Sequence, residues 1–470
     1  MAHDYTELFQ TQRQQFLHRT RFQTVAERRQ KLKDMKVWIR KNQDEIISSV
    51  NADFGKSPEE IKFGEIKPVL GEIDDALENM RKWMSPKKVD TPLFLVGTQG
   101  EVKIEPKGVV LVVAPWNFPF QLTIGPVVSA IAAGNCVTIK PSELTPNTEK
   151  LLVRMIADLY KPEEVTVVTG DAEVGAALLE QPWNHIFFTG SPQVGKIVMN
   201  AAAKHLTSVT LELGGKNPAF VDETANLKDA AEKLLWGKCF NAGQSCISIN
   251  YVLVHESKYD SLIEELRKAK DKLFSNDAAK MQADKAFARI VNDRHYKRIK
   301  HLLDESVKQG AEVVIGGETD ESENYIAPTV LGNVTPETEI FKDEIFGPIL
   351  PIIKYSDIDQ ALELVNSEEI PLALYIFTRS HKFSDKILSS TSAGTTCINE
   401  TTVQFIHPDL PFGGHNFSGI GKAHGYYGFI AFSNERAVLK QKVGVTTAKM
   451  IYPPYTSLKK KMIDILTWKL

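Results

Sequence analysis

Apolar residues recur at helical spacing through residues 1–84, where charged residues separate them, as in AERRQKLKDMKVWIRKNQDEIISSV (26–50). A spacing of three to four residues places apolar side chains on one face of a helix. The pattern therefore predicts a helical lead-in before any sheet begins.

From residue 108 the pattern changes to short β-branched runs that alternate with Ala-rich, helix-like segments. The runs include GVVLVVAP (108–115), CVTIKP (136–141), HIFFTG (185–190) and SVTLEL (208–213). Apolar strands without polar alternation, each separated by one helix, are typical of a parallel sheet covered on both faces. We therefore expect an α/β fold with a Rossmann-like, doubly wound parallel sheet, whose ligands bind at the carboxyl ends of the strands.

A second α/β series follows Glu212. Strands are predicted at YVLVHE (251–256), AEVVIG (311–316), ILPIIKY (349–355), ALYIFT (373–378) and GTTCIN (394–399), and helices at 257–275, 288–308 and 357–366. A chain of 470 residues is long enough for two or three domains, because a single core stops growing at roughly 250–300 residues. The second series is therefore predicted to form a second α/β domain.

Two extended segments fit neither series. Residues 89–108 and 434–444 alternate in polarity and have no obvious sheet partner nearby in the sequence, so we expect each to be an arm that pairs with another subunit. The basic tail SLKKKMIDILTWKL (457–470) allows two interpretations, a weak peripheral membrane contact or a solvated or subunit-packed end. The second is favoured, because one short apolar face binds lipid weakly.

Composition points to small-molecule chemistry. Hydrophobic residues make up 43% and charged residues 24% of the chain, and a formal net charge of -3 attracts neither nucleic acid nor a membrane surface. The four cysteines form no CxxC pair, and neither a signal-peptide run nor a stretch of about 18 apolar residues occurs. We expect a cytoplasmic protein with reduced thiols, no nucleic-acid partner and no membrane span.

Cys246 lies in the turn-prone stretch FNAGQSCIS (240–248), and two interpretations of it are open. A free cysteine is usually a small core residue. A nucleophilic cysteine has to ionise, and backbone amides around it, with a helix expected to begin at the cysteine, would favour the thiolate. The stretch alone does not decide between a structural thiol and a nucleophile.

Two further candidates lie near strand ends. Glu212 in VTLELGGKNPAF (209–220) sits between two leucines before a Gly-Gly turn, where desolvation would make its carboxylate a stronger base. Asn117 in APWNFPF (114–120) follows a strand, where its amide can donate to an oxyanion. The alternatives are a solvent-facing strand glutamate and an asparagine that caps the next helix.

Two segments are suited to a nucleotide. FFTGSPQVGK (187–196) follows a strand and opens a helix, so Gly190, Ser191 and Gly195 would let a pyrophosphate approach the helix N-terminus, although the segment is not GxGxxG. Lys140 and Glu143 in TIKPSE (138–143) end the next strand and are placed to hydrogen-bond a ribose diol. Each charged residue alone also fits an ordinary surface position.

Taken in order, these segments resemble the NAD(P)-dependent aldehyde dehydrogenase superfamily over nearly the whole chain. The short N-terminus, FGEIKPVLGEIDDAL (63–77) and YPPY (452–455) look most like its class 3 branch, which acts on fatty and aromatic aldehydes. The resemblance rests on seven motifs, which are PWNFP, TIKPSE, FTGSPQVG, LELGGKNP, NAGQSC, EIFGPILP and LPFGG.

The resemblance implies roles for individual residues. Cys246 matches the nucleophile, Glu212 the general base, and Asn117 the oxyanion donor, acting with the backbone N–H of Cys246. No metal site is expected, because the eleven histidines include no HExxH motif. The implied cofactor-binding residues are Trp116, Lys140, Glu143, Gly190, Ser191, Gly195, Glu344 and Phe346.

The resemblance also implies a division of the chain. Residues 1–85 and 106–210 would bind NAD(P), 211–415 would form the catalytic domain, 86–105 and 430–445 a small β bridging or oligomerisation arm, and 446–470 a C-terminal tail. Two arms of this kind imply a homodimer built by strand addition between subunits.

The implied reaction oxidises a medium- to long-chain aliphatic or aromatic aldehyde to a carboxylic acid with NAD(P)+. It proceeds through a thiohemiacetal and a thioester on Cys246, which water activated by Glu212 hydrolyses. Glu143 favours NAD, because a glutamate accepts hydrogen bonds from a 2′-hydroxyl and repels a 2′-phosphate, although class 3 relatives use both cofactors. An acylating enzyme that transfers to coenzyme A is disfavoured by Glu212, and a non-catalytic protein by the three intact catalytic positions.

Three residues depart from the family pattern. After LPFGG, His415 and Asn416 stand where members more often carry small residues, which leaves the shape of the substrate entrance open. Ala423 stands where some members place a second carboxylate. A second acid for a proton relay is therefore not expected at this position.

Overall fold

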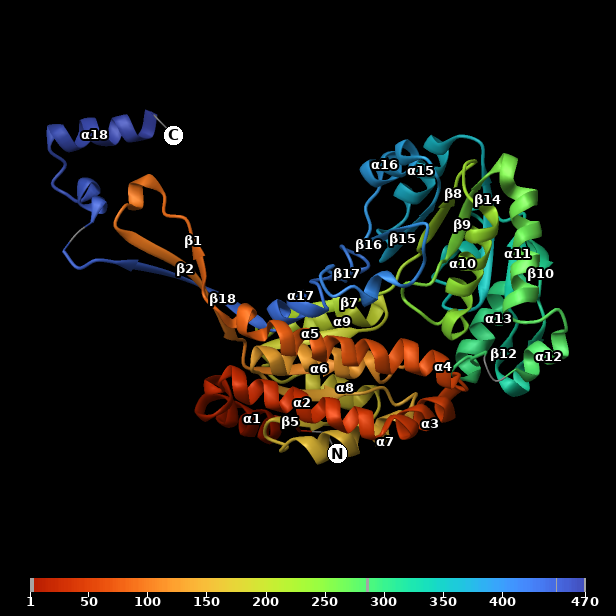
Figure 1. The fold of residues 1–470 in the computed structure, drawn as a ribbon, viewed down its shortest axis with the longest axis horizontal. Helices are drawn as coiled ribbons and strands as arrows, with labels where there is room; N and C mark the ends of the chain where they lie inside the picture. The colour runs from red at the N-terminus through yellow and green to blue at the C-terminus, as the bar shows by residue number, and fades with distance from the viewer. Residues whose placement is uncertain (1–3, 285–286, 445, 469–470) are drawn as a thin grey trace.

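The computed structural model describes residues 4–284, 287–444 and 446–468. Residues 1–3, 285–286, 445 and 469–470, which the predicted domains, arm and tail include, lie outside the described residues. Figure 1 shows two α/β bodies next to each other and a slender arm that projects from the body at the N-terminus.

The predicted helical lead-in is confirmed. Helix α2 begins at a capping box between Thr24 and Glu27, and α3 ends at Gly55 in a left-handed conformation. Both are common helix-boundary signals. The lead-in consists of α1 (Thr6–His18), α2 (Val25–Lys41), α3 (Gln43–Phe54), α4 (Pro58–Ile61), the π turn η2 (Lys62–Ile66) and α5 (Lys67–Met84).

The first sheet has six strands in the order β17-β7-β6-β3-β4-β5, all parallel except the antiparallel edge pair of β17 with β7. Its strands are β3 (Val109–Val113), β4 (Cys136–Lys140), β5 (Val165–Val167), β6 (His185–Thr189), β7 (Ser208–Glu212) and β17 (Gly419–Ile420). Its helices are α6 (Gln121–Ala133), α7 (Pro146–Leu159), α8 (Ala172–Leu179) and α9 (Pro192–Ala203).

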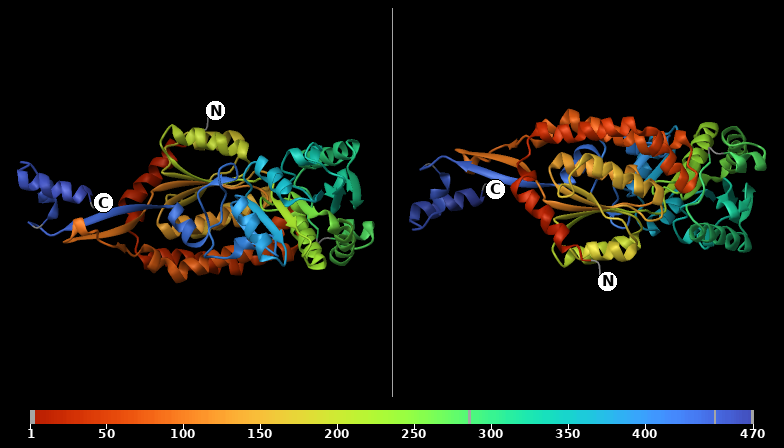
Figure 2. Two further views of the ribbon diagram at one scale, coloured as in Figure 1. Left: turned by 90° about the horizontal axis from the view of Figure 1, so that it is seen from above. Right: turned by 90° about the horizontal axis from the view of Figure 1, so that it is seen from below.

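Both faces of this sheet are covered, as the apolar strand pattern predicts. Val110 and Val112 of β3 pack with α2, α5, α6 and α7, whereas Val109 and Leu111 pack with α1, α8 and α9. Successive strand residues point to opposite faces, so a strand buried on both faces has no polar alternation. Figure 2 shows the sheet edge-on between these two layers of helices.

The second sheet has seven strands in the order β10-β13-β14-β9-β8-β15-β16, parallel except for β10. All five predicted strands are present, together with β8 and β13, which were not predicted. The strands are β8 (Pro218–Val221), β9 (Tyr251–His255), β10 (Glu312–Ile315), β13 (Thr329–Gly332), β14 (Ile349–Tyr355), β15 (Ala373–Phe377) and β16 (Thr395–Ile398).

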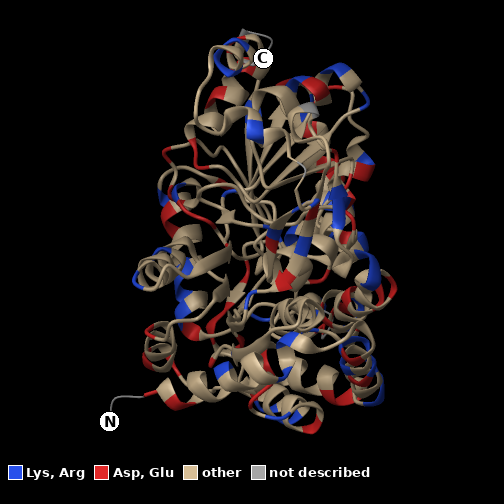
Figure 3. Cartoon of the chain, turned by 90° about the vertical axis from the view of Figure 1, so that its left-hand side faces the viewer, with Lys and Arg blue, Asp and Glu red and all other residues tan. Residues whose placement is uncertain are grey.

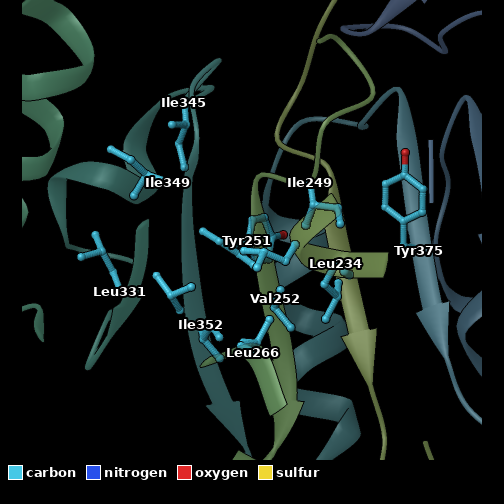
Figure 4. Close-up of a cluster of buried hydrophobic side chains, with 14 of the residues drawn as sticks. Leu234, Ile249, Tyr251, Val252, Leu266, Leu331, Ile345, Ile349, Ile352 and Tyr375 are labelled. Atoms are coloured by element: carbon cyan, nitrogen blue, oxygen red, sulfur yellow. The ribbon is translucent and has the colours of Figure 1, made fainter. Parts of the chain in front are cut away.

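Helices cover this sheet too, and its core is a continuous cluster of aliphatic and aromatic side chains (Figure 4). The predicted helices at 257–275 and 357–366 match α11 and α15, but the one predicted from 288 begins only at Asp293, because Asn292 caps it. The helices are α10 (Leu227–Cys239), α11 (Tyr259–Leu273), α12 (Ala278–Ala283), α13 (Asp293–Lys308), α14 (Glu339–Lys342), α15 (Ile358–Ser367) and α16 (His381–Ser390), with a small hairpin of β11 (Thr319–Asp320) and β12 (Tyr325–Ile326).

The arm has a pairing that was not predicted. The two extended segments, for which we expect pairing with another subunit, also pair with each other: β2 (Thr98–Pro106) pairs with β18 (Ser433–Gln441) within the chain, and β1 (Lys87–Val89) pairs with β2. Their separation along the sequence hid this partnership. The strand β18 follows α17 (Gly425–Ala431) and leads to α18 (Ser457–Trp468), which lies far from both bodies in Figure 1.

Basic and acidic residues are mixed along the described part of the chain. Figure 3 shows Lys and Arg interleaved with Asp and Glu along the same helices. Among these residues no helix combines the length and the apolar character that crossing a bilayer would need.

Candidate active site

The predicted residues of the first sheet share one edge. Val113 at the end of β3 is paired with Lys140 at the end of β4, and Thr189 at the end of β6 is paired with Glu212 at the end of β7. Parallel strands place their carboxyl ends together. The loop of Asn117, which follows β3, therefore lies along the same edge as Lys140 and Glu212, where ligands of such sheets bind.

Two further candidates come from the opposite edge of the second sheet. Cys246 precedes β9 and Glu344 precedes β14, and these strands are parallel neighbours. The side-chain oxygen of Asn250 accepts a hydrogen bond from the N–H of Ile345 at 2.9 Å and ties the two loops together. The carboxyl ends of the first sheet's strands face the amino ends of the second sheet's strands, because Glu212 and Cys246 line the same hollow.

Cys246 lies where two hollows meet. The first is lined by Glu212 as well as Cys246. The second has an apolar wall that includes Phe118, Phe240 and Phe405. Both hollows share Gln121, Leu122, Cys246, Phe412 and His424.

The turn before Cys246 has an uncommon backbone. Asn241, Ala242 and Gly243 have φ angles of 55°, 51° and 73°, in the left-handed region that side chains other than Gly and Asn rarely adopt. No helix begins at Cys246, contrary to the prediction. The cysteine lies in a turn in which the N–H of Ser248 donates to the carbonyl of Ser245 at 3.0 Å.

Two residues that were not predicted hold this turn. The Gln244 side chain donates to the carbonyls of Asn241 and Arg289, at 3.1 and 3.0 Å, and accepts from the N–H of Val291. Asn217 donates to the carbonyls of Cys246 and Ser248, both at 2.8 Å. Both lie inside motifs that resemble the family, but a single sequence does not show which motif residues are structural.

A buried ion pair holds the neighbouring loop of Asn117. Lys56 Nζ lies 2.7 Å from Glu65 Oε1 with both side chains fully buried, and it also donates to the backbone carbonyl of Asn117. Glu65 Oε2 accepts the N–H groups of Phe120 and Gln121. Neither charged residue was predicted, since periodicity assigns both to an ordinary amphipathic lead-in.

Asn117 is buried beside the cysteine turn, and its side-chain amide donates to the carbonyl of Gln244 at 3.1 Å. A primary amide carries two hydrogens. The second hydrogen is therefore available to a ligand.

The environment of the Cys246 thiol opposes ionisation. Burial raises its pKa to about 12, and the carboxylates of Glu344 and Glu212 add to this, while the backbone N–H groups of Cys246 and Ile247 point at the sulfur and lower the pKa. Forming the thiolate therefore requires a proton acceptor in the hollow.

Glu212 is a candidate for that chemistry. It is buried, and neither carboxylate oxygen has a hydrogen-bond partner. Burial raises the pKa of Glu212 well above its usual range, and Lys422 opposes the shift in part. A carboxylate in this state is a stronger base than a solvated one.

The pyrophosphate and ribose candidates have the expected local geometry. Ser191 caps α9, accepting from the N–H of Val194 at 3.4 Å, and Lys140 pairs with Glu143 at 2.9 Å. Gly190 and Gly195 serve packing, because an added Cβ would lie 2.5 Å from Phe188 and 2.9 Å from Leu213.

The remaining cofactor candidates form a cluster at the mouth of the second sheet. Trp116 lies 5.4 Å from Phe346 and 5.1 Å from His295 between ring centroids. Glu344 Oε1 is buried without a partner, and burial raises the pKa of this carboxyl to about 7. The side chain lies against Gly214, where a Cβ would collide with the carboxylate.

Metal chemistry finds no support in the described part of the chain, where no three His, Cys, Asp or Glu side chains gather as metal ligands do. The arrangement instead combines a thiol, an enclosed carboxylate and an amide donor around one hollow. These are the groups needed for nucleophilic attack on a carbonyl, oxyanion stabilisation and hydrolysis.

Comparison with known proteins agrees with this chemistry. The chain resembles the 4,4'-diaponeurosporen-aldehyde dehydrogenase of Staphylococcus aureus, with 39% identity over 94% of this chain and 94% of that protein. It also resembles aldehyde dehydrogenase family 3 member A2 of Pongo abelii, with 40% identity over 92% of this chain and 88% of that one.

A solved structure, the substrate-bound state of Staphylococcus aureus AldH, matches with a TM-score of 0.94 and 38% identity, over 99% of this chain and all of that one. More distant matches include complexes with NAD+ and with NADP. The sequence model of the aldehyde dehydrogenase family matches residues 2–438. The chain therefore belongs to the aldehyde dehydrogenase family, most similar to its class 3 branch, and oxidises aldehydes to carboxylic acids with NAD(P)+.

Proposed function

We propose that this aldehyde dehydrogenase acts on medium- to long-chain aliphatic or aromatic aldehydes, with Cys246 as nucleophile, Glu212 as general base and Asn117 as oxyanion donor. One observation carries the assignment of residues. Cys246 and Glu212, from different sheets, line the same hollow, and Asn117 is buried against the turn that bears the cysteine.

The first step is attack of the Cys246 thiolate on the aldehyde carbon. The N–H groups that point at the sulfur stabilise the thiolate. As the carbon–sulfur bond forms, negative charge develops on the carbonyl oxygen. The free hydrogen of the Asn117 amide, with the N–H of Cys246, stabilises this charge, a contribution of roughly 2.7–4 kcal/mol per donor.

The residues present fit NAD(P)+. Glu344 Oε1 is an orphaned buried acceptor at the second sheet, and Val194 and Ile197 expose apolar surface beside the capped end of α9. When bound, NAD(P)+ supplies the two-electron oxidant. Glu344, Phe346 and Trp116 would hold its nicotinamide riboside, Lys140 and Glu143 its adenosine ribose, and Gly190, Ser191 and Gly195 its pyrophosphate.

The thioester that oxidation leaves on Cys246 is then hydrolysed. Glu212 takes a proton from water, the hydroxide oxygen bonds to the acyl carbon, and the carbon–sulfur bond breaks to release the carboxylic acid. The raised pKa of Glu212 suits it to this proton transfer, because a general base works best with a pKa near the working pH.

NAD is the proposed preference. Glu143, which pairs with Lys140, is the proposed contact to the adenosine ribose, where its carboxylate would accept from a 2′-hydroxyl and repel a 2′-phosphate. The preference for apolar aldehydes draws on the aromatic wall of the second hollow and on the relative named for a diaponeurosporen aldehyde.

We also propose a cytoplasmic homodimer. The strand β18 is an edge of the arm, with β2 on one side only, and the arm and tail expose Leu439, Val443, Ile451 and Tyr455. An open edge with apolar neighbours favours pairing with a second copy. Four free cysteines suit a reducing compartment.

The test is NADH and NADPH formation over a panel of aldehydes of rising chain length, without coenzyme A. Aldehyde-dependent NADH formation that strengthens with chain length is expected, and Cys246→Ser should abolish it. A Cys246→Ser variant that retains the wild-type rate would show that the nucleophile is misassigned.

A further inference from the structure

His424 occupies a special place beside the catalytic hollows. It follows Ala423, where the sequence lacks a second acid, and its side chain lines both hollows together with Cys246. His424 Nδ1 lies 2.6 Å from Glu72 Oε1, and Glu72 Oε2 accepts the N–H of Gly425 at 3.0 Å. A carboxylate only accepts, so Nδ1 carries the proton and Nε2 is left as a proton acceptor.

The backbone conformation of His424 is strained, which favours a functional role for its side chain. Its φ and ψ angles are 67° and 142°, a region in which glycine is at ease and side chains are strained. Glu72 of α5 holds the residue there through both carboxylate oxygens. Strain of this kind persists where the surrounding structure determines it, and it clusters at active sites.

The catalytic hollow needs a route for protons. Glu212 is buried and neither carboxylate oxygen has a hydrogen-bond partner, so no side chain that is hydrogen-bonded to it can pass its proton to solvent. Among the described residues that line the two hollows, the titratable side chains besides Cys246 and Glu212 are Glu72 and His424. These two are 11% and 10% exposed, so they reach toward solvent.

We propose that Glu72 and His424 form a proton relay that carries the proton from Glu212 to solvent during thioester hydrolysis. The inference rests on the proposed function. Protonated Glu212 loses its O–H proton to water in the hollow, and this water gives a proton to His424 Nε2. The imidazolium keeps its Nδ1–H bond to ionised Glu72 and then gives the Nε2 proton to water that exchanges with solvent, which leaves His424 neutral with Nδ1 protonated and Glu212 ionised.

Further carboxylates lie near the pair. Burial raises the pKa of Asp75 to about 6, and the charges of Glu72, Asp409 and Glu78 add to the shift. The edge of Phe412 packs on the imidazole at 5.1 Å. Lys422, the nearby cation, is directed away to the carbonyls of Gly413 and Gly414.

His424→Asn separates relay from structure. An asparagine amide donates to Glu72 as Nδ1 does, but it has no basic nitrogen. His415→Asn is the matched control, since His415 is exposed and lines neither hollow. The probe is p-nitrophenyl acetate, which acylates Cys246 without a nicotinamide, so acyl-enzyme hydrolysis is measured apart from aldehyde oxidation.

The relay predicts that His424→Asn keeps the burst of p-nitrophenolate but slows steady-state hydrolysis roughly 10- to 100-fold. Added imidazole should restore the rate, and Glu72→Gln should shift the pH profile with a smaller loss. His424→Asn hydrolysis at the wild-type rate, or a slow variant that imidazole does not restore, would overturn the relay. Failure of the wild type to oxidise any aldehyde would instead sink the proposed function, because the ester assay does not depend on it.

Discussion

At the scale of single residues, enclosure decides the chemistry of this site. Glu212 becomes a strong base because both its oxygens are buried without partners. Cys246 is held among two carboxylates that oppose its ionisation, with backbone N–H groups as its support. The residue types alone are ordinary, and their surroundings make them reactive.

Glu212→Gln should stall the second half of the reaction. Without a base, the thioester forms and hydrolyses slowly, so a single burst of NADH is expected, followed by turnover lowered roughly 10²- to 10⁴-fold. Stopped-flow NADH absorbance measures both phases. The exposed Glu173→Gln serves as control, and turnover of Glu212→Gln at the wild-type rate would contradict the role.

The same variant tests the pH dependence. Burial raises the pKa of Glu212, and only its ionised form accepts a proton from water. Wild-type hydrolysis should therefore slow as the pH falls through this raised pKa. Residual hydrolysis by Glu212→Gln should lack that decline above the usual glutamate pKa.

At the scale of elements, loops rather than helices or strands position Cys246, the proposed nucleophile. Three successive left-handed residues shape the turn before Cys246, and the side chains of Gln244 and Asn217 fix it. The buried Lys56 and Glu65 pair fixes the adjoining loop of Asn117. Such pairs define geometry more than they add stability.

Gly243→Ala should damage this turn. Gly243 has a φ of 73°, and a Cβ there would collide with the carbonyl oxygen of Gly347. Gly310→Ala is the matched control, since its φ is 100° and no atom lies within 4 Å of the added Cβ. Both substitutions carry the cost of a left-handed alanine, about 1–2 kcal/mol, but only Gly243→Ala should lower the rate of acylation by more than about tenfold. Equal rates in the burst assay would show that the turn tolerates displacement.

At the scale of the whole molecule, the meeting of two sheets makes the site and a third sheet projects away from it (Figure 1). The strand β18 covers one side of β2 and leaves its own outer edge open. That edge and the exposed apolar residues of the arm and tail are the surface proposed to join two copies.

Leu439→Arg should weaken the dimer. Leu439 lies on β18 and is 59% exposed, so a charge there would have to be desolvated on association. Leu206→Arg is the control, because Leu206 is 95% exposed and lies outside the arm. Sedimentation velocity at micromolar concentration should show a dimer for wild type and control and dissociation for Leu439→Arg. A monomeric wild type would refute the assembly.

The sequence by itself determined the helical lead-in, the two α/β series and the residues of the candidate chemistry, because periodicity and local motifs are short-range properties of the chain. It also gave Cys246, Glu212 and Asn117 as candidates through motifs that resemble the family, and their roles stay a proposal. The division into domains stays a prediction at its stated boundaries.

Only the tertiary structure decided which distant segments meet. It paired β2 with β18 within one chain, showed that a left-handed turn rather than a helix carries Cys246, and brought Glu72 to His424 at the catalytic hollows. Each is a contact between residues far apart in sequence or a backbone state imposed by such contacts. The pattern of residues in a short segment does not predict these contacts. Their interaction energy depends on burial of the polar side chains, which occurs only when distant elements pack together.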